Sequence, residues 1–133
     1  MNTVARPADI LCIEDDGELV DLIRLILEQQ GYTFRGCTSG EEGLEAARTK
    51  VPDLVLLDLM MPGMDGWEVL RRMRRDPKLA GVPVVLVTAK AQGIDKMLGL
   101  HVARANDYIT KPFGPQELID CVARVLAEGP TSV

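Results

Sequence analysis

Residues 54–58 read Leu-Val-Leu-Leu-Asp, an apolar run of four that ends in a carboxylate. A short, uninterrupted apolar run of this kind is typical of a strand buried on both faces, as in a parallel sheet. Similar runs lie at residues 10–13 and 84–87, and longer amphipathic patterns separate them. This alternation is typical of βαβ units and predicts an α/β fold with a doubly wound parallel sheet.

We expect five strands, and the second is the least apolar, which suits the edge of a sheet. Their predicted positions are residues 10–13, 33–37, 54–57, 84–87 and 108–110. If the strand order is the flavodoxin-like 2-1-3-4-5, the first and third strands are neighbours where the order reverses. Functional groups of open parallel sheets gather there, at the carboxyl ends of the strands.

Helix start signals agree with this scheme. Ser39 is followed three residues later by Glu42, which forms a capping box, and Asp65 stands in the same relation to Glu68. Pro115 occupies a first-turn position where proline is tolerated. A run of arginines in the third predicted helix is expected to form its solvated face: Arg71, Arg72, Arg74 and Arg75.

Length and composition indicate a single globular domain. The chain has 133 residues, 47% apolar and 26% charged, so we expect one domain over residues 1–133, with its core at about 8–127 and short flexible tails. The net charge of −5 argues against direct nucleic-acid binding. We find no signal core or membrane-spanning run, which favours a cytoplasmic location. The three cysteines have no paired spacing and are expected to be free thiols.

Polar residues stand where the predicted strands end. Glu14 and Asp15 follow the first strand, Asp58 the third, Thr88 the fourth and Lys111 the fifth. The three carboxylates should converge and repel one another, and a hard divalent cation such as Mg²⁺ would remove that cost. Asp58 is the best placed nucleophile toward phosphorus, and Lys111 and Thr88 suit phosphoryl oxygens.

Each of these features also has a plainer explanation. The acidic run could simply cap the first helix, Asp58 could form a turn before Pro62, and Lys111 could be a solvated loop charge. These explanations are nearly independent of one another. Four matching strand ends in the required order therefore favour a functional site.

Four segments resemble one known family, the receiver domain of two-component response regulators, of the single-domain chemotaxis-regulator type. They are residues 10–16 (ILCIEDD), 54–66 (LVLLDLMMPGMDG), 83–89 (PVVLVTA) and 107–113 (DYITKPF). The resemblance covers residues 8–127. It implies that the chain is a signalling switch and not an enzyme. This switch would accept a phosphoryl group from a sensor histidine kinase or phosphotransfer protein.

The resemblance also implies roles for single residues around a metal site. Asp58 would be the phosphoacceptor, Asp15 a direct Mg²⁺ ligand, Glu14 a ligand through water, and the backbone carbonyl of Met60 a further ligand. Mn²⁺ would be able to replace Mg²⁺.

On the other side of the site, the resemblance implies that Thr88 and Lys111 contact the phosphoryl group. Thr88 and Tyr108 would form a switch pair, and Pro112 would follow a cis peptide bond. The surface made by the fourth helix, the fifth strand and the fifth helix would then change and regulate a downstream protein or a fused output module.

Two residues depart from the family pattern. Arg104 stands where members usually have glycine after the fourth helix, and it would have to adopt a left-handed conformation. Cys121 stands where the DNA-binding subfamily that dimerises through this face often has arginine, so we do not predict that dimer.

Three alternative functions remain. An unphosphorylated receiver-like adaptor would share the fold. A Mg²⁺-dependent phosphohydrolase resembling the haloacid dehalogenases would need its nucleophile at the end of the first strand, where this chain has Glu14-Asp15-Asp16. A nucleotide-binding or flavin-binding protein would need a glycine-rich or hydroxyl-rich loop there.

Overall fold

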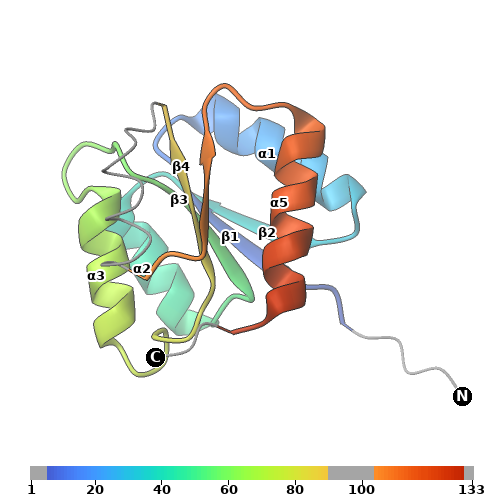
Figure 1. Ribbon diagram of the computed structural model, residues 1–133. Coiled ribbons are helices and arrows are strands. Elements are labelled where there is room, and N and C mark those ends of the chain that lie inside the picture. Colours follow the sequence, from blue (N-terminus) through green and yellow to red (C-terminus); the bar gives the residue numbers. More distant parts are fainter. Residues whose placement is uncertain (1–5, 90–103, 131–133) are drawn as a thin grey trace, which may run out of the picture.

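The computed structural model describes residues 6–89 and 104–130. Within them, five parallel strands form one sheet in the order β2-β1-β3-β4-β5, which confirms the predicted fold class and strand order (Figure 1). The strands are β1 (Asp9–Ile13), β2 (Thr33–Cys37), β3 (Leu54–Asp58), β4 (Val84–Thr88) and β5 (Asp107–Thr110).

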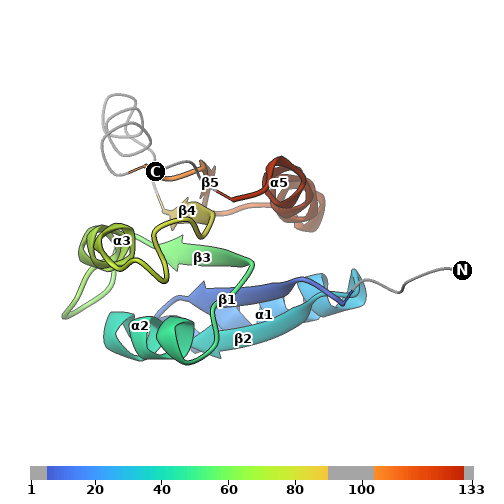
Figure 2. The ribbon, with the colours of Figure 1, turned by 90° about the horizontal axis from the view of Figure 1, so that it is seen from below.

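The described helices cover both faces of the sheet. They are α1 (Gly17–Gln29), α2 (Gly40–Thr49), α3 (Gly66–Arg75) and α5 (Pro115–Glu128). One face packs against α1 and α5 and the other against α2 and α3, so the molecule has three layers (Figure 2). The predicted fourth helix falls at residues 90–103, outside the described residues.

The core consists of two apolar clusters, one on each face of the sheet. Every residue of β1, β3 and β4 is buried, whereas β2 is only partly buried, as expected for an edge strand. Because the central strands are enclosed on both sides, their carboxyl ends are fixed relative to one another. That rigid edge of the sheet carries the polar residues described below.

The predicted helix starts are confirmed. The Ser39 hydroxyl accepts a hydrogen bond from the Glu42 amide at 3.2 Å, and the Asp65 carboxylate accepts one from the Glu68 amide at 3.0 Å. Pro115 occupies the first turn of α5. These caps satisfy amide groups that otherwise have no partner in a helix.

The four arginines of α3 were predicted to form its solvated face, and for Arg74 this is wrong. Arg71, Arg72 and Arg75 are exposed, but the side chain of Arg74 is buried. Arg74 follows the buried Leu70 by four residues and therefore lies on the inward stripe of the helix. The helical period, rather than the charge run, determines its position.

No helix in the described parts of the chain is both long enough and apolar enough to cross a bilayer.

Gly66 lets α3 begin directly against the backbone of β3. A β-carbon at this position would lie 2.3 Å from the carbonyl oxygen of Asp58 and 2.7 Å from the α-carbon of Leu59. Both neighbours are backbone atoms, so they cannot move aside as a flexible side chain would. The missing side chain therefore determines how closely α3 approaches the end of β3.

We predict that Gly66→Ala lowers the free energy of unfolding by about 2 kcal/mol, because overpacking displaces α3 from β3. Gly17→Ala is the matched control, since Gly17 also begins a helix and a β-carbon added there would meet nothing within 4 Å. Urea denaturation of both variants measures the difference. Equal stabilities would contradict the close approach.

Candidate functional site

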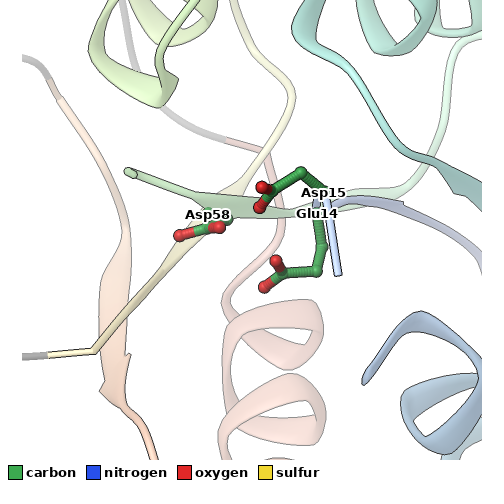
Figure 3. Close-up of side chains that lie close together, drawn as sticks. All are labelled: Glu14, Asp15 and Asp58. Carbon is green, nitrogen blue, oxygen red and sulfur yellow. The ribbon is translucent and has the colours of Figure 1, made fainter. Parts of the chain in front are cut away.

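Strands β1 and β3 bring three carboxylates together. Ile13 pairs with Leu57 in the parallel register, so Glu14 and Asp15, which follow β1, lie beside Asp58 at the end of β3. One carboxylate oxygen from each of the three lies within 4.8 Å of the others (Figure 3). The predicted convergence of Glu14, Asp15 and Asp58 is confirmed.

The three acidic residues differ in exposure. The residues Glu14 and Asp58 are each 2% exposed, whereas Asp15 is exposed to solvent. Asp15 therefore forms the open side of the cluster. An ion or ligand can approach from that side and meet two carboxylates that are largely shielded from water.

Helix capping accounts for only one member of the acidic run. The carboxylate of Asp16 accepts hydrogen bonds from the amides of Glu18 and Leu19 at 3.1 and 3.3 Å and caps α1. Glu14 instead accepts a hydrogen bond from the amide of Asp16 at 3.1 Å. The plainer explanation thus holds for Asp16, while Glu14 and Asp15 lie in the cluster with Asp58.

Lys111 provides a positive charge inside this cluster. Its ammonium nitrogen lies 2.7 Å from Oε1 of Glu14 and 3.6 Å from Oδ2 of Asp58. The amide of Lys111 also donates a hydrogen bond to the carbonyl of Thr88 at 2.7 Å, which ties the end of β5 to the end of β4. The Lys111–Pro112 peptide bond is cis, in agreement with the prediction for Pro112.

Burial and charge shift the pKa values of these groups. Desolvation and the neighbouring Glu14 carboxylate raise the pKa of Asp58 to about 7, and the amide of Met60 and the charge of Lys111 only partly oppose this. Burial lowers the pKa of Lys111, but the hydrogen bond to Glu14 and the charge of Asp58 outweigh that effect, so the net shift is upward. Lys111 therefore stays protonated beside carboxylates that repel one another.

The segment after β3 borders Asp58. The amide of Met60 donates a hydrogen bond to Oδ1 of Asp58 at 3.0 Å, which orients the carboxylate. The side chain of Met60 is 72% exposed, whereas the next residue, Met61, is buried in the core. The backbone of residue 60 therefore stands next to the carboxylate while its side chain faces solvent.

Strands β4 and β5 place the other two predicted site residues. Thr88 ends β4 and is buried, and it pairs with Thr110 in the parallel register. Tyr108 pairs with Leu86, two residues before Thr88, and packs partly buried against the cluster formed with α2 and α3. Both residues thus belong to the strand pair that leads to Lys111.

The donor set fits a hard divalent cation. The three carboxylates offer only oxygen atoms, and two of them are buried close together. Mg²⁺ binds such oxygen ligands while keeping several waters, and the exposed position of Asp15 leaves space for those waters. The ammonium of Lys111 contacts two of the three carboxylates, those of Glu14 and Asp58, so the cluster favours a further positive charge.

Comparison with known proteins identifies the family. The model of the response regulator receiver domain matches residues 10–123, so the chain belongs to the receiver domains of response regulators. A curated relative is the DNA-binding response regulator MtrA of Mycolicibacterium paratuberculosis, 46% identical over 118 residues. The match covers 89% of this chain but 49% of that protein, so the chain spans about half the length of the curated relatives it matches.

Solved structures agree with this assignment. A putative response regulator from Chloroflexus aurantiacus J-10-fl is 36% identical with a TM-score of 0.85, and the match covers 91% of this chain and 98% of that chain. The receiver domain of a sensor histidine kinase from Pseudomonas aeruginosa PAO1 is 29% identical with a TM-score of 0.82, over 91% and 98% of the two chains. Its structure holds a magnesium ion in the active-site cleft. This chain thus belongs to a family of signalling proteins.

We predict that Asp58→Asn stabilises the fold in the absence of metal. A carboxyl pKa raised to about 7 means that the folded chain keeps a proton that the unfolded chain, with a pKa of about 4, releases. This group therefore lowers the stability progressively as the pH rises from about 4 to 7. Asparagine does not titrate, and Lys111 keeps its contact with Glu14.

The expected gain is about 4 kcal/mol at pH 8 and about 1 kcal/mol at pH 5, measured by urea denaturation with a chelator present. Asp53→Asn is a control, because the pKa of Asp53 is lowered: burial raises it, but the hydrogen bonds from Arg6 and the Asp9 amide lower it more. That variant should lose stability at pH 8. A gain from Asp58→Asn that does not depend on pH would contradict the charge repulsion.

Proposed function

We propose that this domain is a phosphorylation-dependent switch in which Asp58 accepts a phosphoryl group from the phosphohistidine of a sensor histidine kinase or phosphotransfer protein. The observation that carries the proposal is a buried carboxylate with two acidic neighbours and one ammonium within reach. Membership of the receiver family supports the same chemistry. In the transfer, an Asp58 oxygen forms a bond to phosphorus as the bond from phosphorus to the histidine nitrogen breaks.

The metal site in this proposal is the acidic cluster. Asp15 and Asp58 would hold Mg²⁺ directly, Glu14 through water, and the backbone carbonyl of Met60 would complete the protein ligands. When bound, Mg²⁺ supplies positive charge to the phosphoryl oxygens. Mn²⁺ accepts the same oxygen ligands and is proposed as a substitute.

The residues on β4 and β5 act on the phosphoryl group from the other side. Lys111 would exchange part of its contact with Glu14 for a phosphoryl oxygen, and the Thr88 hydroxyl would donate a hydrogen bond to another. Tyr108, on the strand next to Thr88, would turn inward when that hydroxyl moves. We propose that phosphorylation then shifts the population of conformations of the surface predicted for the fourth helix, β5 and α5.

The proposed output is binding to a protein, in the cytoplasm. The target is a downstream protein or an output module outside these residues. MtrA is named as DNA-binding, and this chain matches only half of it, so we assign no nucleic-acid contact to this domain. Its net charge of −5 supports that view. Cys121, which stands where the dimerising subfamily often has arginine, is buried, so we do not propose that dimer for this chain.

Intact-mass spectrometry after incubation with acetyl phosphate tests the phosphoacceptor. We expect one added, base-labile phosphoryl group in the native chain with Mg²⁺, and none with a chelator or in Asp58→Asn. Asp65→Asn is the matched control, because Asp65 caps α3 and lies outside the acidic cluster. No added mass under any condition would contradict the proposal and favour the unphosphorylated adaptor.

A further inference from the structure

Arg74 is a buried cation that the proposed chemistry does not use. Its residue is 8% exposed, and it lies on the inward stripe of α3. Desolvation and the charge of Arg104 lower the pKa of its guanidinium to about 10, so it remains charged near neutral pH. In the part of the chain that the structure describes, no carboxylate forms an ion pair with it.

The hydrogen-bond acceptors of the Arg74 guanidinium are mainly backbone carbonyl oxygens. Nε and Nη2 of Arg74 donate hydrogen bonds to the backbone carbonyl of Arg104 at 3.1 and 2.7 Å. Nη1 donates to the carbonyls of Val82 at 2.8 Å and Ala80 at 3.2 Å, and Nη2 also lies 3.5 Å from Oδ1 of Asn106. One guanidinium thus joins α3 to the turn before β4 and to the residues just before β5.

The residues held by Arg74 have conformations that need support. Arg104 has a φ of +60°, in the left-handed region that glycine would favour, as predicted from the sequence. Two hydrogen bonds from Arg74 hold its carbonyl in place. The amide of Asn106 donates to the carbonyl of Val84 at 2.8 Å, and its side-chain oxygen accepts from the amide of Val84 at 2.9 Å.

Hydrogen bonds at its two ends matter for β5, because its own side chains determine its register in the sheet only weakly. It has four residues at the edge of the sheet, and only Ile109 is fully buried. A shift by one residue would turn every side chain to the opposite face of the sheet. Asn106 holds the beginning of the strand and the bond from the Lys111 amide to Thr88 holds its end.

We propose that Arg74 is a positioning residue for Lys111 and Tyr108, acting through the carbonyl of Arg104 and the side chain of Asn106. The inference rests on the proposed function, because it concerns the β5 side of that site. Glu14 and Asp15 follow β1 and Asp58 ends β3, and Arg74 contacts neither of these strands through any of these hydrogen bonds. Loss of the guanidinium should therefore disturb the half of the site that contains Lys111 and Tyr108 and spare the half that contains the carboxylates.

The test compares Arg74→Lys with Arg75→Gln. Lysine keeps the positive charge but lacks the planar fork of donors that reaches several carbonyls at once. Arg75 is the next residue on α3 and is exposed, so it controls for changes to the helix itself. Asn106→Ala is a second variant, which removes the Asn106 part of the connection, including its bond to the Val84 amide, and leaves Arg74 and its bonds to Arg104 unchanged.

We expect Arg74→Lys and Asn106→Ala to bind Mg²⁺ with an affinity within about twofold of the native chain, while the rate of phosphorylation by acetyl phosphate falls about tenfold or more, as expected from displacement of a positioned group. Arg75→Gln should change neither value. Unchanged rates in both variants, or Mg²⁺ affinity that falls in step with the rate, would overturn the positioning role.

Amide NMR signals separate this inference from the proposed function. In Arg74→Lys, the signals of Tyr108 and Lys111 should move while that of Asp15, which makes no contact with Lys111, stays in place, whether or not the chain is phosphorylated. If that division appears but the native chain gains no phosphoryl group, the proposed function fails and the positioning role stands. If the signals of both halves move equally, the positioning role fails.

Discussion

The mutual repulsion of three carboxylates held at one edge of a parallel sheet is the constraint on which the rest of the site depends. Strands β1 and β3 are buried along their whole length, so Glu14 and Asp58 cannot move apart to relieve it. Lys111 offsets part of the repulsion, and burial together with the neighbouring Glu14 carboxylate still raises the pKa of Asp58 to about 7. In the proposed function, a bound cation or phosphoryl group would change this balance and with it the contacts of Lys111 at the end of β5.

Much of the fold could be predicted from the sequence because its signals are local. The apolar run before Asp58 and the caps at Ser39 and Asp65 each depend on a few adjacent residues. Other features depend on distant partners. Strand β1 begins at Asp9, one residue before the apolar run from which the strand was predicted. Asp9 is polar but buried, because Arg35 of β2 forms an ion pair with it at 2.7 Å.

In the candidate site, too, some features follow from local sequence signals and others depend on distant parts of the chain. Strand ends were sufficient to predict that Glu14, Asp15 and Asp58 meet, since parallel neighbours end at one edge. The difference in burial between Glu14 and Asp15 could not be predicted, because it depends on how the chain turns into α1. The burial of Arg74 was missed because its arginine neighbours suggested a solvated face, although its spacing from Leu70 places it on the inward stripe of α3. Its partners could not be predicted, because they are carbonyl oxygens up to 30 residues away and hydrogen bonds to the backbone leave no residue-type signal.

Calorimetric titration with Mg²⁺ at pH 7, in two buffers of different ionisation enthalpy, tests the central claim most directly. If the repelling carboxylates form the metal site, a single ion should bind and release about half a proton, because Asp58 with a pKa of about 7 is half protonated before the metal arrives. The release should approach zero at pH 9. No proton release at pH 7, or the same release from Asp58→Asn, would contradict the account.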